Sequence, residues 1–351
     1  MTRTAARGKA NITSVKCVNR RVTLKDVAAR AGISRSSASL ALRGDGRLTD
    51  ETRARVQQAI VDLGYVYNRS AAALRSSDRR VIGIVVTSVA NPFFAESTMA
   101  IETELGRLGY MALIANTFND SEREKRILRN LQEFGVAAIV LAPAENNDFD
   151  SAWALEQHGI PCLSFTRFVG SNPSSYVGPD DKAGGQLAAA HLIQHGARSL
   201  AYLGGIVGGA ARTDRIAGAK NALRDANMPE NLRAYGSVTT STGGLRAGRD
   251  LIANGEMPDG VICQSDAVAF GFYRAISEAG VRAPRITAFD DVELAAMWNP
   301  PLTTVSSQPQ HLGALAARMI VARLSSPQAP PSTFWTEPHL VVRESCGCPA
   351  T

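Results

Sequence analysis

The chain has 351 residues, of which 45% are hydrophobic and 20% are charged, and its net charge is +6. A chain of this length and composition folds as a globular protein of two or three domains. No stretch approaches the roughly 18 uncharged apolar residues of a membrane span, and the basic N-terminal segment lacks the apolar run of a secretory signal. These features exclude a membrane-embedded protein, and we expect a cytoplasmic one.

The positive charge is concentrated at the N-terminal end. Residues 1–80 contain 17 Lys and Arg against 6 Asp and Glu, whereas the remainder contains 21 against 26. Basic side chains gain free energy by displacing counterions from phosphates, so this part is a candidate for binding nucleic acid. A solvated basic face would show the same charge, and the local pattern must decide. We expect residues 1–20 to form a disordered basic arm.

Helix signals begin directly after this arm. Thr23 and Asp26 have the spacing of a capping box, which predicts a first helix, and Gly32 can end it in a left-handed turn. Ser34 then caps a second helix at 35–42, whose first residues are small and polar, as in an element that enters the major groove of DNA.

A third helix is predicted from residue 49 onward. Its apolar residues Val56, Ile60 and Leu63 recur with helical spacing and can cover the first two helices. Residues 21–66 therefore form the expected all-α helix-turn-helix domain.

Three segments of this region, VTLKDVAARAGIS, LTDETRARVQQAIVDLGYVYN and RSAAALRSS, resemble the LacI/GalR family of bacterial transcriptional regulators. The resemblance implies that Arg35 and Ser36 are the main base readers, because the planar fork of an arginine matches guanine. Leu40 stands where many members carry arginine, so it contacts a thymine methyl group or packs inward. The other expected contacts of this domain with DNA are Thr23, Ser34, Ser37 and Ser39.

Residues 67–79 resemble the hinge helix of the family, which orders when two subunits meet on DNA. Leu74 matches the leucine that wedges into the minor groove at the operator centre, where opening a base step is offset by the contacts that the bend permits. Composition alone would also fit an ordinary linker helix with a core leucine. The other expected hinge contacts are Asn68, Arg69, Ala71 and Arg75.

From residue 80 onward, short apolar runs alternate with amphipathic stretches, a pattern typical of βαβ units and parallel sheets. Ligands of open α/β sheets bind beyond the carboxyl ends of strands, so the residues that follow each run are pocket candidates. The expected strands lie at 81–86, 111–115, 137–141, 161–165, 200–203 and 261–263.

Further segments, among them RTDRIAGAKNALRDANM and HLVVRES, resemble the effector-binding core of the same family. The resemblance implies a periplasmic-binding-protein-like α/β core with parallel sheets at 80–345, in which three crossing strands join two lobes. We expect one lobe at 80–177 and 304–328, the other at 178–303 and 329–345, and a short tail at 346–351.

The resemblance also suggests the effector contacts. Arg215 matches an arginine that grips effector oxygens, although a surface arginine is the plainer alternative. Asp290 matches an acid that accepts hydrogen bonds from the ligand. Asp266 is an effector contact or simply a helix cap. The remaining expected contacts are Asn91, Phe93 and Phe289.

Several positions depart from the family pattern. The segment before Phe289 is shorter than usual, so a strand or its loop is trimmed, and Ser307 stands where many members have a ligand-facing glutamine. Asp180 and Asp181 match an acidic turn that is mostly structural in the family.

The five cysteines are odd in number and scattered, which argues against a disulfide framework. Only Cys346 and Cys348 lie close together in the sequence, and we expect free thiols in a frayed tail, with no metal site and no cofactor.

These features predict a transcriptional repressor that binds a pseudo-palindromic operator as a homodimer and a sugar-like effector between its lobes. A periplasmic solute-binding protein would lack the basic helix-turn-helix. An enzyme would need a nucleophile and base, and the glycine-rich segment 204–209 lacks the Lys-Ser/Thr of a phosphate loop. A nucleoid-type DNA binder without an effector is a third alternative, which ligand-dependent melting shifts would exclude.

Overall fold

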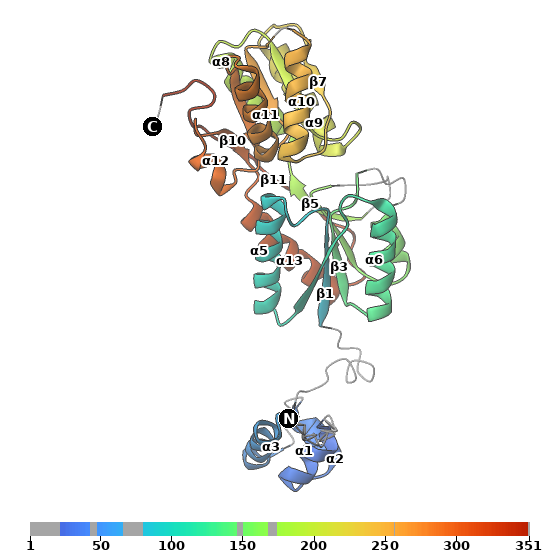
Figure 1. The fold of residues 1–351 in the computed structure, drawn as a ribbon. Coiled ribbons are helices and arrows are strands. Elements are labelled where there is room, and N and C mark those ends of the chain that lie inside the picture. Colours follow the sequence, from blue (N-terminus) through green and yellow to red (C-terminus); the bar gives the residue numbers. More distant parts are fainter. Residues whose placement is uncertain are drawn as a thin grey trace, which may run out of the picture. The chain divides into compact units, whose positions relative to one another are not determined.

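The computed structural model describes residues 22–42, 48–65, 80–145, 150–167, 174–255 and 257–349. The chain divides into two compact units, Met1–Asp78 and Arg79–Thr351 (Figure 1). None of the described helices is long and apolar enough to cross a membrane.

The first unit contains three helices, α1 (Leu24–Ala31), α2 (Arg35–Leu42) and α3 (Asp50–Leu63). The predicted capping box is present, because the backbone N–H of Thr23 donates to Asp26 Oδ2 at 2.8 Å and the Thr23 side chain accepts from the Asp26 N–H. Gly32 ends α1 with a left-handed φ of 66°.

Apolar positions of α1 and α3 face each other and form the small core of this unit. Ile60 and Leu63 of α3 pack against it, so the predicted covering of the first two helices by the third is confirmed. The buried residues of the core are Val27, Ala31, Val56 and Ala59.

The second unit holds two six-stranded sheets (Figure 1). The first sheet has the order β11-β5-β4-β3-β1-β2 and is parallel throughout. Its strands are β1 (Val81–Val86), β2 (Met111–Asn116), β3 (Ala138–Leu141), β4 (Cys162–Phe165), β5 (Ser175–Pro179) and β11 (Thr333–Thr336).

The second sheet has the order β12-β10-β9-β8-β6-β7, and only its edge strand β12 runs antiparallel to its neighbour. Its strands are β6 (Leu200–Leu203), β7 (Arg233–Tyr235), β8 (Gly260–Cys263), β9 (Arg285–Phe289), β10 (Thr303–Ser306) and β12 (His339–Val341). The segment before Phe289, which the resemblance suggests is shortened, contains the five-residue strand β9.

Helices cover the sheets as the alternating sequence pattern predicts. The helices of the first lobe are α5 (Pro92–Arg107), α6 (Ser121–Phe134), α7 (Ser151–Gln157) and α13 (Pro309–Ser325). Those of the second lobe are α8 (Asp181–Gln194), α9 (Ala210–Asp225), α10 (Ser241–Ala253), α11 (Asp266–Ala279) and α12 (Glu293–Met297).

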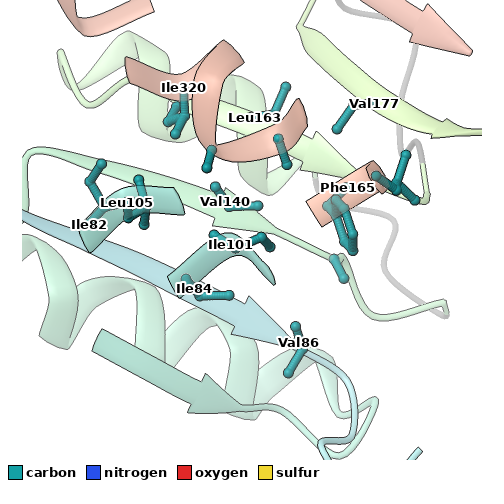
Figure 2. Close-up of a cluster of buried hydrophobic side chains, with 14 of the residues drawn as sticks. Ile82, Ile84, Val86, Ile101, Leu105, Val140, Leu163, Phe165, Val177 and Ile320 are labelled. Carbon is teal, nitrogen blue, oxygen red and sulfur yellow. The ribbon is translucent and has the colours of Figure 1, made fainter. Parts of the chain in front are cut away.

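The core of the first lobe lies between its sheet and the helices α5 and α13. Figure 2 shows Ile101 of α5 and Ile320 of α13 against side chains of the strands, among them Ile82 and Val140. These residues are almost completely buried, so a helix from the far end of the sequence completes the first lobe.

The chain passes between the lobes after β5, between β10 and α13, and between β11 and β12, which gives the three expected crossings. Two strands belong to a different sheet from the one that the expected lobe ranges imply. β10 pairs with β9 of the second sheet, and β11 pairs with β5 of the first. Both strands lie next to a crossing, where the chain can join either sheet. Their sequences do not indicate which strand each of them pairs with.

The expectation of a frayed C-terminal tail is wrong. Cys346 is fully buried, and its sulfur accepts a hydrogen bond from the Thr303 hydroxyl at 3.1 Å. The Ser345 hydroxyl donates to the Ile286 carbonyl at 2.7 Å and accepts from the Thr303 N–H. Ser345 and Cys346 are therefore fastened to the second sheet by side-chain bonds that hydrophobic periodicity does not reveal.

Candidate functional site

The first helical turn of α2 presents small polar side chains to solvent. Arg35 and Ser36 are exposed, and Ser37 is half-buried. The Ser34 hydroxyl accepts from the Ser37 N–H at 3.0 Å and lies 2.8 Å from the hydroxyls of both Ser36 and Ser37. Capping thus holds these hydroxyls together at the helix N-terminus, a position whose free N–H groups favour phosphate.

The other residues expected to contact DNA are less uniform in exposure. Thr23 is exposed, and its hydroxyl is engaged by the capping box. Ser39 and Leu40 are half-buried, and the core of this unit is built from other residues, so part of Leu40 faces solvent. The five hinge residues, Asn68, Arg69, Ala71, Leu74 and Arg75, lie outside the described residues.

In the second unit, residues of both lobes line one pocket. The lining residues are Asn91, Phe93, Phe94, Thr166, Arg167, Pro179, Asp181, Ala211, Arg215, Thr239, Gln264, Ser265, Asp290 and Ser307.

Arg215, on α9, is held from three sides. Its Nε donates to Asp181 Oδ1 at 2.7 Å, and its Nη1 donates to the Gln264 carbonyl at 2.6 Å. Its guanidinium carbon lies 3.8 Å from the centroid of the Phe289 ring. Side-chain exposure of Arg215 and Asp181 is only 8% each, so this charge is desolvated, fixed in orientation and ready to meet an oxygen in the pocket.

Asp290 follows the carboxyl end of β9 and adopts a φ of 105°, a region that non-glycine residues rarely enter. Such strain persists where the surroundings hold it, and it is typical of binding sites. Burial raises the pKa of Asp290 to about 7, and the nearby charge of Arg215 opposes this shift. The carboxyl group can therefore act as an acceptor, or when protonated as a donor, toward a ligand hydroxyl.

Two of the expected effector residues do not line the pocket. Asp266 is fully buried, and its oxygens accept from the Val292 N–H at 2.9 Å and the Thr304 hydroxyl at 2.7 Å. Its place is structural, since it ties the chain before α12 to β10. Phe289 is 1% exposed and lies beneath Arg215, so it supports the guanidinium without facing the pocket.

Asn91, Phe93, Arg215 and Asp290 are brought together in the pocket, and Asn91 also caps α5 through the Phe93 N–H at 3.0 Å. The sequence did not single out four other polar lining residues. Thr166 and Arg167 follow β4, and Gln264 and Ser265 follow β8. Each follows the carboxyl end of an expected strand, so the strand-end rule covers these positions without distinguishing them from other loop residues. Ser307, noted as a departure from a ligand-facing glutamine, follows β10 and also lines the pocket.

Comparisons with known proteins agree with this architecture. The model of bacterial regulatory proteins of the lacI family matches residues 23–68, and that of the periplasmic binding protein-like domain matches residues 189–346. The Ribose operon repressor of Haemophilus influenzae is 30% identical over 330 residues, which cover 92% of this chain and 98% of the relative.

The HTH-type transcriptional repressor PurR of Mannheimia succiniciproducens is 31% identical over 329 residues, with the same shares of both chains covered. A crystal structure of the lac repressor dimer bound to operator and an anti-inducer has a TM-score of 0.84 at 24% identity, covering 93% of this chain and 99% of that one. The Ribose operon repressor and PurR are both transcriptional repressors and not enzymes. The chain belongs to the lacI family of bacterial regulatory proteins.

Proposed function

We propose that this regulator represses transcription in the cytoplasm, binding a pseudo-palindromic operator as a homodimer whose affinity for DNA changes when a sugar-like effector enters the pocket. The observation that carries this proposal is the buried Arg215, clamped by Asp181 and Gln264 and accompanied in the pocket by Asp290. A fixed cationic fork and a carboxyl group can donate to and accept from neighbouring hydroxyls of one ligand.

The pocket also offers apolar surface for such a ligand. Phe93 and Phe94 line it from the first lobe, and their rings pack edge to face with centroids 5.4 Å apart. Arg167 lies on the same side, where its Nη2 is 3.3 Å from Glu145 Oε1. Aromatic faces with a few fixed polar groups are the usual lining of small-molecule sites and suit a sugar ring.

Effector control requires that the ligand prefer one arrangement of the two lobes. Because the pocket is lined from both lobes, a ligand that bridges Arg215 and Asn91 favours one relative placement of them. The effector then changes how well two subunits hold their DNA-reading domains on the operator, with a coupling typically of about 1–3 kcal/mol.

For DNA, we propose that Arg35 and Ser36 read bases, that Ser37 and Ser39 contact phosphates or adjacent bases, and that Leu74 of the hinge wedges into the minor groove. The exposed polar turn at the start of α2 and the basic composition of residues 1–80 support this reading.

A thermal-shift screen tests the effector proposal directly. The relatives are named for a ribose operon and for purine regulation, so pentoses, hexoses, disaccharides and purine bases form the panel. A ligand of the pocket stabilises the folded protein by mass action, and Arg215→Gln should remove the shift. The matched control is Arg224→Gln, which changes an exposed arginine at the other end of α9 that pairs with Glu230.

A compound that shifts Arg215→Gln as strongly as the parent protein would place the effector elsewhere. A panel in which only purine bases shift the melting temperature would replace the sugar by a purine. Operator affinity with and without the active compound, measured by fluorescence anisotropy, then shows whether it releases or strengthens DNA binding.

A further inference from the structure

Three side chains of the kinds that bind transition metals meet at the C-terminal end of α8. His191 lies in the last turn of the helix, and His195 follows it at the cap. A spacing of four residues puts both rings on one helix face, and their centroids are 4.5 Å apart. Cys348 reaches the same place from the C-terminal tail, and one ligand atom from each residue lies within 4.8 Å of the others.

The separations match the geometry of a tetrahedral metal. Cys348 Sγ is 3.3 Å from His195 Nε2 and 3.7 Å from His191 Nε2. With Zn–S near 2.3 Å and Zn–N near 2.0–2.1 Å, a tetrahedral ion separates its sulfur and nitrogen ligands by about 3.6 Å. An ion could therefore bind between these atoms with only small side-chain movements.

The backbone of the C-terminal tail places the Cys348 thiol beside the two histidines. Gly347 adopts a left-handed φ of 88°, and its N–H bonds to the Glu344 carbonyl at 2.9 Å, which turns the chain sharply between the two cysteines. The Cys346 thiol accepts a hydrogen bond from the Thr303 hydroxyl at 3.1 Å and donates one to the Arg343 carbonyl at 3.3 Å. Cys346 is thus an anchor that fixes the turn, while Cys348 is half-exposed beside the histidines.

We propose that His191, His195 and Cys348 bind one Zn²⁺ ion per protomer, with water at the fourth position. Imidazole nitrogen and thiolate sulfur are the ligands that zinc prefers among protein groups. On binding, the Cys348 thiol gives its proton to solvent, and both imidazoles coordinate in their neutral form. The ion would fasten the tail to α8, whose first residue, Asp181, holds Arg215 in the effector pocket.

The test uses untagged full-length protein that has been stripped with a chelator and then loaded with Zn²⁺ or Co²⁺. We expect about one metal equivalent per chain to survive dialysis, and a higher melting temperature with Zn²⁺ than without. Co²⁺ should give the visible bands of a tetrahedral site together with a thiolate-to-metal charge-transfer band in the near ultraviolet, which only a cysteine ligand produces.

Cys348→Ser should abolish the charge-transfer band and the retained metal, and so should His195→Ala. His311→Ala, which removes an exposed histidine on α13, should bind metal like the parent protein. Metal-free melting temperatures identify any variant that fails to fold, and His195→Gln then replaces His195→Ala. Failure of the parent to retain metal, or retention by folded Cys348→Ser, would overturn the proposal.

Discussion

The buried ion pair between Asp181 and Arg215 allows a quantitative test of how the effector site is held. Asp181→Ala would leave the Arg215 guanidinium desolvated with one charge partner removed. Breaking a buried pair from one side typically costs about 3–5 kcal/mol. Here the Gln264 carbonyl and the Phe289 ring still face the cation, so we expect a loss of about 3 kcal/mol in the free energy of unfolding.

Urea denaturation followed by circular dichroism measures this loss, provided that the slope of the transition is unchanged. The matched control is Glu230→Ala, which breaks the pair between Arg224 and Glu230 on the protein surface. These side chains are 60% and 42% exposed, so the expected loss is below about 1 kcal/mol. Equal losses for the two variants would refute the clamp, because Arg215 would then have another partner or access to water.

Four further changes test other parts of the molecule. Arg35→Ala should relax base preference at one operator position and cost about 1–3 kcal/mol there, as measured by binding to a set of singly substituted operators; a uniform loss across all of them would make Arg35 a phosphate contact. Leu74→Ala should weaken operator binding far more than binding to random DNA in the same titration, and equal losses would contradict the wedge. Gly185→Ala should destabilise the protein by about 1–3 kcal/mol in urea, since the new Cβ would overlap the Arg215 carbonyl, whereas Gly106→Ala meets open space and should be neutral or stabilising. Because the pKa of Asp290 is raised to about 7, the folded state keeps a proton that the unfolded state releases near pH 4, so the contribution of Asp290 to stability should fall as pH rises between these values; burial also raises the pKa of Asp266, so Asp290→Asn should reduce the slope, and not remove it, in urea titrations at several pH values, and an unchanged slope would assign it to other groups.

Features set by local chemistry were predictable from the sequence. The capping box of Thr23 and Asp26 and the glycine stop at Gly32 depend on residues within one helical turn, so their pattern suffices. The alternation of apolar runs and amphipathic stretches likewise predicts the α/β core, because each strand must be buried on both faces.

The choice among similar residues was not predictable. Asp266 and Asp290 each follow a strand closely, yet one is enclosed by Val292 and Thr304 while the other enters the pocket. The sheet to which β10 or β11 belongs, and the approach of Cys348 to α8, depend on chain crossings between distant segments. In the sequence, only the four-residue spacing of His191 and His195 indicates that the two rings meet. The approach of Cys348 to them follows from the fold alone.

These observations give α8 a special position in the molecule. Its first residue, Asp181, orients Arg215 in the pocket, and its last turn carries His191, about 15 Å away at 1.5 Å per residue. Any influence of zinc at one end on effector binding at the other must be reciprocal, because coupling between two binding equilibria is a single free energy. The factor by which Zn²⁺ changes effector affinity must therefore equal the factor by which effector changes zinc affinity, and the two titrations together measure the coupling free energy between the two ends of α8.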